Sequence, residues 1–433
     1  MKSITIFWFR RDLRIEDNCG FFHALKENKS VLPIFIFDEN ILKHFSNDDP
    51  RVEFIYNSLM SLNNVFKKNK SSIEIYKGKP EKVFKELLLK TYKIKSVYFN
   101  KDYEPYAIER DEKIKKLLIS KKINVFDFKD HVIYEKNEIT KADGSPYRVY
   151  TPYSKLWLNK FLSESVVRYE SENHLDSLVK YENVNKISFE GLGLKKSLIK
   201  IHQYKVDISF INNYESRRNF PIHQTSKLGV YLRFGKLSIR DIVLLASKSN
   251  NYTFLKELIW REFFIQILWH FPYTVEKSFK PKYDSIKWTN DKIKFKLWCQ
   301  GKTGFPLVDA GMIELNSTGF MHNRVRMLVG SFLCKHLLID WRWGEAYFAK
   351  KLLDYEAASN IGNWQWVAGC GVDSAPYFRI FNPTEQIKKF DKDFEYIKKW
   401  IPNYNSKDYI EPIVNHKDAR ALCLKIYKEA LNQ

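Results

Sequence analysis

The sequence lacks paired cysteines and long apolar runs. Its five cysteines show no CxxC spacing, so we expect reduced thiols, no metal ion and a cytosolic compartment. No apolar stretch is long enough to cross a membrane. The first apolar run, ITIFWF (4–9), is short and flanked by charges, which is typical of a strand rather than a signal peptide. These absences predict a cytoplasmic protein without a membrane segment.

The glycine motifs that hold nucleotide phosphates are also absent. No GxGxxG follows the first predicted strand, where WFRRDLR stands instead, so a dinucleotide site of the usual kind is not expected there. The stretch GKTG (301–304) is similar to the end of a P-loop. The position five before Gly301 is Lys296 rather than glycine, and we therefore interpret the stretch as a turn.

Acidic residues are too few to balance the basic ones. The chain has 72 Lys and Arg against 51 Asp and Glu, a formal net charge of +21. This excess favours a polyanionic partner such as nucleic acid, although a Lys- and Asn-rich composition inherited from an AT-rich genome would also produce it. Aromatic residues reach 16%, and most of the 11 tryptophans lie between Trp260 and Trp366. We expect the chemistry of the protein in that region.

The hydrophobic pattern predicts two kinds of domain. Five apolar runs read as strands buried on both faces, and amphipathic stretches separate them; the runs span 4–9, 31–37, 72–77, 95–100 and 124–128. Strand–helix alternation of this kind predicts a doubly wound parallel α/β sheet. From about residue 200 the pattern is helical, with examples at 237–248, 254–271 and 319–338. We predict an α/β domain (1–130), a linker (131–200) and an all-helical domain (201–433).

Polar residues stand on otherwise apolar helix faces of the predicted helical domain. Glu257 and Arg261 flank Trp260 within one turn, and a plain surface ion pair would give the same pattern. Asn323, Arg326 and Met327 share one face by their spacing, so the polar members need partners if they are buried. Asp354 and Glu356 follow as available acids.

Two segments have the composition of binding loops. In HQTSKLGVYLRFG (223–235), the hydroxyls of Thr225 and Ser226 precede a helical run. Such groups suit a phosphate, although a plain N-cap is the commoner explanation. In NIGNWQWVAGCGVDSAPYFRIFNP (360–383), Trp364 and Trp366 alternate with amide side chains. This mixture predicts a pocket for a flat, polar, aromatic ligand.

Five ordered motifs together resemble the photolyase/cryptochrome family. They are WFRRDLRIEDN, TSKLGVYLRFG, ELIWREF, GKTGFPLVDAGMIELNSTGFMHNRVRM and WQWVAGCGVDSAPYFRIFNP. Across nearly the whole chain, the resemblance is to class I members that repair cyclobutane pyrimidine dimers. It implies a DNA repair enzyme, a carbon–carbon lyase in which photoexcited reduced FAD passes an electron to a flipped-out dimer. The helical domain would then bind both FAD and DNA.

The same resemblance assigns roles to individual residues. It implies an FAD site made of Tyr214, Thr225, Ser226, Lys227, Leu228, Gly229, Phe254, Arg326, Asp354, Glu356 and Asn360. It implies an electron relay made of Trp364, Trp341 and Trp288. The dimer would be bound by Glu257, Trp260, Arg261, Asn323, Met327 and Trp366, with Glu257 and Asn323 also acting on the reacting bases. Arg324 and Arg379 would contact DNA phosphates.

Several alternatives stay open at this point. A cryptochrome-type blue-light photoreceptor without repair activity is the main one. Two features disfavour it: the residues expected to bind the dimer are all present, and the sequence ends at Gln433 without a long signalling tail. Repair of (6-4) photoproducts is disfavoured because MHNRVRM lacks the expected His pair. A light-independent nucleic-acid-binding flavoprotein would leave the tryptophans unexplained. Tyr106 and Ala107 stand where folate-binding members have an Asn-Glu pair, which disfavours a folate antenna. A deazaflavin, a second flavin or no antenna all stay open. We expect a monomer that acts on dimer-containing DNA without an obligate protein partner.

Overall fold

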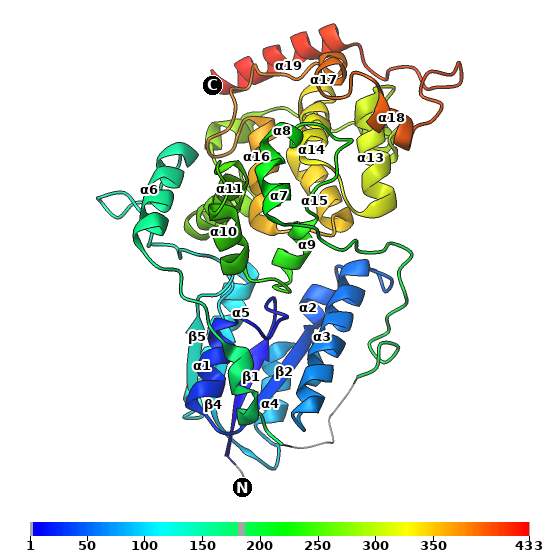
Figure 1. The fold of residues 1–433 in the computed structure, drawn as a ribbon. Coiled ribbons are helices and arrows are strands. Elements are labelled where there is room, and N and C mark those ends of the chain that lie inside the picture. The colour runs from blue at the N-terminus through cyan, green and yellow to red at the C-terminus, as the bar shows by residue number, and fades with distance from the viewer. Residues whose placement is uncertain (1–2, 181–186, 433) are drawn as a thin grey trace. The chain divides into compact units, whose positions relative to one another are not determined.

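The computed structural model describes residues 3–180 and 187–432, and the chain divides into two compact units. The first unit comprises residues 1–138, 158–203 and 228–248. The second comprises residues 139–157, 204–227 and 249–433. Figure 1 labels the helices and strands of each unit and colours the chain by residue number, from blue at the N-terminus to red at the C-terminus. Among the described residues, no helix is both long enough and apolar enough to span a bilayer.

A five-stranded parallel sheet forms the centre of the first unit, in the order β3-β2-β1-β4-β5. Its strands are β1 (Ser3–Phe9), β2 (Val31–Asp38), β3 (Glu74–Gly78), β4 (Lys93–Asn100) and β5 (Asn124–Phe128). The order reverses between β1 and β4, which is the arrangement of a doubly wound sheet. The predicted fold class of this part of the chain is confirmed.

Helices cover both faces of the sheet because successive strand residues point to opposite sides. Phe7 and Phe9 of β1 pack in one cluster with residues of α1 and α3. Ile6 and Trp8 pack in the opposite cluster with residues of α4 and α5. The helices of this unit are α1 (Cys19–Glu27), α2 (Glu39–Leu42), α3 (Pro50–Lys68), α4 (Pro80–Leu87), α5 (Pro105–Ser120), η1 (Ser171–Ser177), α9 (Leu228–Arg233) and α10 (Ile239–Ser247), while α6 (Tyr150–Ser163) runs through the boundary of the two units.

The edge strand β5 departs from the sequence-based expectation of burial on both faces. β5 pairs only with β4, and the side chain of Phe126 is 40% exposed. An edge strand has a neighbour on one side only, so fewer elements cover it. The expectation of complete burial was therefore wrong for β5.

Buried ion pairs explain why residues 228–248 belong to the first unit. Arg240 of α10 lies 2.8 Å from Asp17 and 2.9 Å from Asp130, and Arg14 also pairs with Asp130 at 2.8 Å. Buried charges are tolerated when they are paired in this way. The segment is thereby anchored to the loop that follows β1.

The second unit is built of helices. They are α7 (Ile208–Asn212), α8 (Tyr214–Arg217), α11 (Thr253–His270), η2 (Pro272–Val275), η3 (Pro281–Ser285), α12 (Lys292–Gln300), α13 (Pro306–Thr318), α14 (Asn323–Ser331), the π-helical η4 (Phe332–His336), α15 (Trp341–Lys351), α16 (Ala357–Ala368), α17 (Pro383–Phe390), α18 (Glu395–Trp400) and α19 (His416–Leu431). Their largest core joins α13, α14, α15 and α16. The predicted helical architecture is confirmed.

The run 319–338, expected as one helical stretch, is interrupted at its start. Gly319 ends α13 with a left-handed backbone (φ 67°), a conformation that glycine adopts without strain. His322 then caps α14, its Nδ1 accepting from the backbone N–H of Arg324 at 3.1 Å. The break matters because it sets where α14 begins and which of its side chains face the pocket described next.

Candidate functional site

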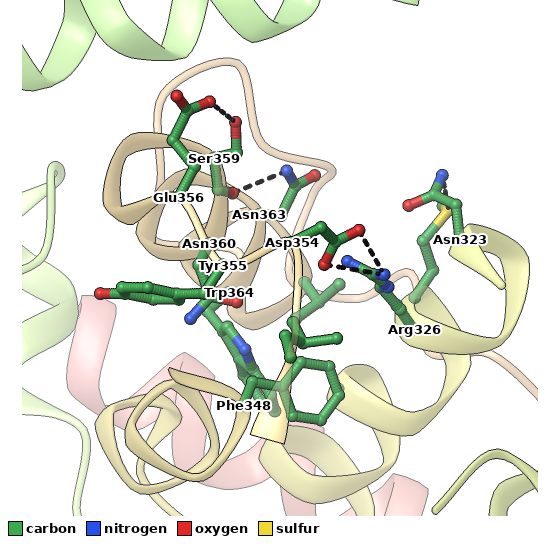
Figure 2. A pocket seen from close by; sticks show the side chains of 14 residues that line it. Asn323, Arg326, Phe348, Asp354, Tyr355, Glu356, Ser359, Asn360, Asn363 and Trp364 are labelled. Carbon is green, nitrogen blue, oxygen red and sulfur yellow. Dashed lines mark hydrogen bonds and ion pairs between the residues drawn. The ribbon is translucent and has the colours of Figure 1, made fainter. Parts of the chain in front are cut away.

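A pocket open to solvent lies among α14, α15 and α16 in the second unit (Figure 2). Its empty volume, including the open solvent at its mouth, is about 560 Å³. It is lined by Asn323, Arg326, Met327, Gly330, Phe348, Leu352, Asp354, Tyr355, Glu356, Ser359, Asn360, Asn363, Trp364 and Val367. Seven residues predicted from the sequence to bind cofactor or substrate, or to relay electrons, are therefore brought together: Asn323, Arg326, Met327, Asp354, Glu356, Asn360 and Trp364.

Helical periodicity accounts for most of this lining. Asn323, Arg326, Met327 and Gly330 of α14 follow the spacing i, i+3, i+4, i+7, which places them on one face. The residues Asn360, Asn363, Trp364 and Val367 of α16 repeat the same spacing. One face of each helix therefore lines the same cavity. Together the two faces supply amide, guanidinium and apolar side chains.

Trp364 forms the apolar floor of the pocket. Its side chain is 3% exposed, and Phe348 meets it edge-on with ring centroids 4.9 Å apart. A Cβ atom at Gly344 would lie 2.2 Å from Cη2 of Trp364. Glycine at 344 therefore lets α15 approach the indole closely.

Three polar contacts, made by Arg326 and Asn360, hold the walls of the pocket. Arg326 pairs with Asp354 at 2.9 Å, and its Nε donates to the carbonyl oxygen of Met321 at 2.7 Å (Figure 2 shows the ion pair). Asn360 donates from Nδ2 to Oε1 of Glu345 at 2.9 Å. Burial raises the pKa of Glu345, while the bond from Asn360 opposes that rise. These contacts fix the side chains of Arg326 and Asn360, which would otherwise rotate.

The helix α11 is tied to the pocket by charge and by close packing. Arg261 pairs with the buried Glu356 at 3.1 Å. Gly362 of α16 allows Phe264 to approach, since a Cβ at that position would lie 2.2 Å from Cδ1 of Phe264. The α11 residues predicted to bind substrate are thus held beside the pocket, although they do not line it.

Glu257 and Trp260 each have a partner from another segment. Arg218 lies 2.7 Å from Glu257. Burial raises the pKa of Glu257, and Arg218 counteracts part of that rise. Trp260 stacks on Tyr150, with ring centroids 3.6 Å apart and planes 7° apart. Glu257 and Trp260 are therefore each positioned by a residue that no local sequence pattern indicated as part of the site.

The loop before α9 carries unusual polar groups. Oγ1 of Thr225 is buried and has no hydrogen-bond partner within residues 3–180 and 187–432. Lys227 adopts φ 56°, and its Nζ lies 2.9 Å from the centroid of the Phe320 ring. Burial lowers the pKa of Lys227 to about 8, with smaller effects from the nearby charges of Glu314 and Arg326. Ser226 accepts from the N–H of Lys205 at 3.0 Å, whereas Leu228 and Gly229 begin α9 in the other unit.

The other predicted residues lie outside the pocket. Phe254 is buried, and Tyr214 meets it edge-on at 5.0 Å. Trp341 is buried at the start of α15, and the partly buried Trp288 contacts Tyr427 edge-on at 6.0 Å. Trp366 is partly buried and packs on the core that contains Trp364.

The two predicted phosphate-binding arginines differ in surroundings. Arg324 bonds to Asn219 and lies 4.3 Å above the Phe390 ring. Burial and the positive charges of Arg218 and Arg379 lower the pKa of Arg324. Arg379 is exposed. The electrostatic influence of Arg218 and Arg379 on Arg324 indicates a locally positive region suited to anions.

Sequence reasoning missed several residues of the site. Asn363 could have been found, because it lies three residues after Asn360 on the same helix face. Glu345, Tyr355 and Ser359 carry no comparable signal. Arg218 and Tyr150 come from segments remote in sequence from α11, so only the folded structure reveals them.

The residues present fit the FAD that the motifs imply. Oγ1 of Thr225, which has no hydrogen-bond partner among the described residues, offers a donor for a phosphate group, and the ammonium of Lys227 offers a positive charge. The pocket supplies a charged pair, Arg326 with Asp354, beside the apolar faces of Phe348 and Val367. A few polar groups set in an apolar concave surface are what a flat heteroaromatic ligand requires.

Comparison with known proteins agrees with this geometry. Residues 254–407 match the family described as the FAD binding domain of DNA photolyase, and residues 5–172 match the DNA photolyase family. The chain is 33% identical over 479 residues to a deoxyribodipyrimidine photo-lyase of Alkalihalophilus pseudofirmus, covering 98% of each chain.

Two solved structures are similar along nearly their whole length. An archaeal photolyase from Sulfolobus tokodaii, whose crystal structure has two FAD molecules, shares 33% identity and a TM-score of 0.84 over 98% of this chain and 100% of that one. A cryptochrome from Synechocystis sp. shares 25% identity and a TM-score of 0.86, covering 98% and 99%.

Proposed function

The chain belongs to the DNA photolyase family and is an FAD-dependent DNA repair enzyme, and from this premise we propose that it splits cyclobutane pyrimidine dimers as a class I member. The proposal rests on one observation above the others. Glu257 and Trp260 stand on one turn of α11, and the adjacent Arg261 joins that turn to the pocket through Glu356. A polar group and a stacking face are thus held together beside the cofactor pocket.

The substrate must leave the duplex to reach such a site. Photolyases flip their target bases out of the helix and recognise them by stacking and by hydrogen bonds to their edges. Trp260 and Trp366 are both partly buried, so each keeps part of its indole accessible to a base. Glu257 and Asn323 supply hydrogen-bonding groups for the pyrimidine edges and stabilise charge that develops on them.

The chain's own residues position the cofactor and exclude water. Arg326, Asp354, Glu356 and Asn360 would hold the flavin end of FAD, whereas Thr225 and Lys227 would hold its phosphates. When bound in its reduced form, FAD supplies the electron that opens the cyclobutane ring after light absorption. The apolar side chains of Phe348 and Trp364 line this part of the pocket, and an apolar surrounding strengthens each electrostatic contact beside it.

Trp364, Trp341 and Trp288 form the proposed electron relay. Trp364 lines the pocket, Trp341 is buried at the start of α15, and Trp288 is partly buried. This series changes from buried to partly exposed, as a path from a cofactor to solvent requires.

DNA binding would use the positive charge of the chain. Arg324 and Arg379 are the proposed phosphate contacts, and the net charge of +21 favours association with a polyanion. We expect the enzyme to act as a monomer in the cytoplasm.

A second candidate is a cryptochrome-type blue-light photoreceptor without repair activity, favoured by the similarity to the Synechocystis cryptochrome. Binding in the dark separates the two. A photolyase should bind an oligonucleotide with one cyclobutane dimer far more tightly than the same undamaged sequence or one carrying a (6-4) photoproduct. Equal affinity for all three oligonucleotides would contradict dimer repair and favour the photoreceptor.

A second chromophore is also testable. The Sulfolobus tokodaii photolyase structure has two FAD molecules, with the implication of a novel light-harvesting cofactor. Extraction of the purified protein followed by chromatography would count the chromophores, and more than one per chain would support an antenna here.

A further inference from the structure

Among the described aromatic rings, that of Tyr150 lies closest to the Trp260 indole. Their planes are 7° apart, and their centroids are separated by 3.6 Å. This spacing corresponds to nearly complete face-to-face overlap, because offset or edge-on aromatic pairs usually have centroids 4.5–7 Å apart. One face of the Trp260 indole is therefore covered by the Tyr150 ring.

Tyr150 is itself held by two hydrogen bonds. Its hydroxyl donates to the carbonyl oxygen of Lys256 at 2.8 Å. That carbonyl belongs to the residue four positions before Trp260, so the bond anchors the tyrosine to the turn of α11 that carries the tryptophan. The backbone N–H of Tyr150 donates to Oδ2 of Asp373 at 3.1 Å.

These bonds connect the two helices that carry the proposed stacking residues. Lys256 and Trp260 belong to α11, whereas Asp373 lies in the loop that follows α16, the helix of Trp366. Phe263 contacts both rings edge-on, with its ring centroid 5.6 Å from that of Trp260 and 5.8 Å from that of Tyr150. Tyr150 is only 9% exposed, so it cannot itself be the main stacking surface for a base.

We propose that Tyr150 is a positioning residue for damage recognition, which backs Trp260 and fixes the plane on which an extruded pyrimidine stacks. The inference rests on the proposed function, because it takes Trp260 as the stacking wall. A rigid second ring behind the indole prevents rotation of Trp260 about its side-chain bonds. Less conformational freedom is then lost when the base arrives, and the affinity for the damaged site rises accordingly.

The test uses the full-length, FAD-loaded protein and two matched oligonucleotides, one with a single cyclobutane dimer and one undamaged. Tyr150→Leu removes the planar ring and should weaken dimer binding by about 2- to 12-fold, the range of an aromatic pair. Affinity for the undamaged oligonucleotide should stay unchanged. Tyr150→Phe keeps the ring and loses only the hydroxyl, so it should recover most of the discrimination.

Tyr153 provides a control on the same helix. It is buried and packs on Phe263 at 5.2 Å, so Tyr153→Leu should cost stability and change both DNA affinities alike. If Tyr150→Leu does not fold, Tyr150→Met fills the space with a flexible chain and replaces it in the comparison. Failure of both variants to fold would assign Tyr150 to the core alone and overturn the proposal.

Trp260→Ala separates this inference from the proposed function. If Trp260→Ala leaves discrimination intact, Trp260 is not the stacking wall and the proposed recognition mode fails. If Trp260→Ala removes discrimination but Tyr150→Leu does not, only the role of Tyr150 is refuted. If Trp260 is the stacking wall and Tyr150 positions it, adding Tyr150→Leu to Trp260→Ala should cause no further loss of discrimination between the two oligonucleotides. The Tyr150 ring then has no indole to position.

Discussion

Gly344 provides a sharp test of the pocket geometry, because an added methyl group would collide with the pocket floor. In Gly344→Ala, the new Cβ would lie 2.2 Å from Cη2 of Trp364 and 2.6 Å from Cδ2 of Leu333. To reach an ordinary contact of 3.4 Å, the indole and the methyl group must separate by about 1.2 Å. Trp364 is fully packed, so this displacement should shift the residue that lines the pocket.

The magnitude follows from two opposing effects. Overpacking a close-packed core costs about 1–3 kcal/mol, whereas replacing glycine by alanine inside a helix gains about 1 kcal/mol. Gly330 of α14 offers a matched control for stability near the same indole. A Cβ there would lie 3.5 Å from Trp364 and 3.1 Å from Val367, which a slight shift of Val367 can accommodate.

The helix-propensity gain is common to both variants, so their difference isolates the collision. Chemical denaturation should show Gly344→Ala to be less stable than Gly330→Ala by about 1–3 kcal/mol. The FAD content of the purified protein, measured by absorbance, should also fall for Gly344→Ala. Equal stability of the two variants would refute the close approach of α15 to Trp364.

Three further predictions address recognition and cofactor binding. Trp366→Ala should weaken binding to dimer-containing DNA by about 5- to 150-fold, the worth of base–aromatic stacking, while undamaged DNA binds as before in parallel titrations; equal losses on both would exclude the stacking role. Because burial lowers the pKa of Lys227 to about 8, its ammonium charge is lost as the pH rises through that value, so FAD affinity measured by flavin fluorescence should fall above pH 8. Lys227→Arg stays charged and should remove this pH dependence. If FAD affinity depends on pH in the same way in the variant and the wild type, Lys227 does not contact the phosphates. Affinity for damaged DNA should fall about tenfold or more over a few-fold increase in salt, and a flat response would contradict phosphate contacts by Arg324 and Arg379.

Some parts of the site were predictable because their spacing is local. Asn323, Arg326 and Met327 share a face of one helix, as do Asn360 and Trp364, and a helical repeat alone places each set together. The parallel sheet was predictable for a similar reason, since its buried strands are short apolar runs separated by amphipathic helices.

Other parts depend on contacts between distant segments. Tyr150 lies behind Trp260 although 110 positions separate them in the sequence, and Arg218 reaches Glu257 from the C-terminal cap of α8. No periodicity encodes such pairs, because they arise only when whole elements pack.

The break between α13 and α14 had a visible but ambiguous cause. Gly319 is a common helix terminator, yet apolar residues continue on both sides of it. The left-handed conformation of Gly319 and the cap formed by His322 show in the structure that one helix ends and the next begins there.

Repair in light and in darkness tests the central claim most directly. Purified protein, reduced beforehand, is mixed with an excess of oligonucleotide carrying one cyclobutane dimer, and intact pyrimidines are counted by chromatography. Under blue light each enzyme molecule should restore many dimers, whereas the dark sample should restore none. Absence of repair under light by FAD-loaded protein that binds the oligonucleotide would contradict the assignment as a dimer photolyase.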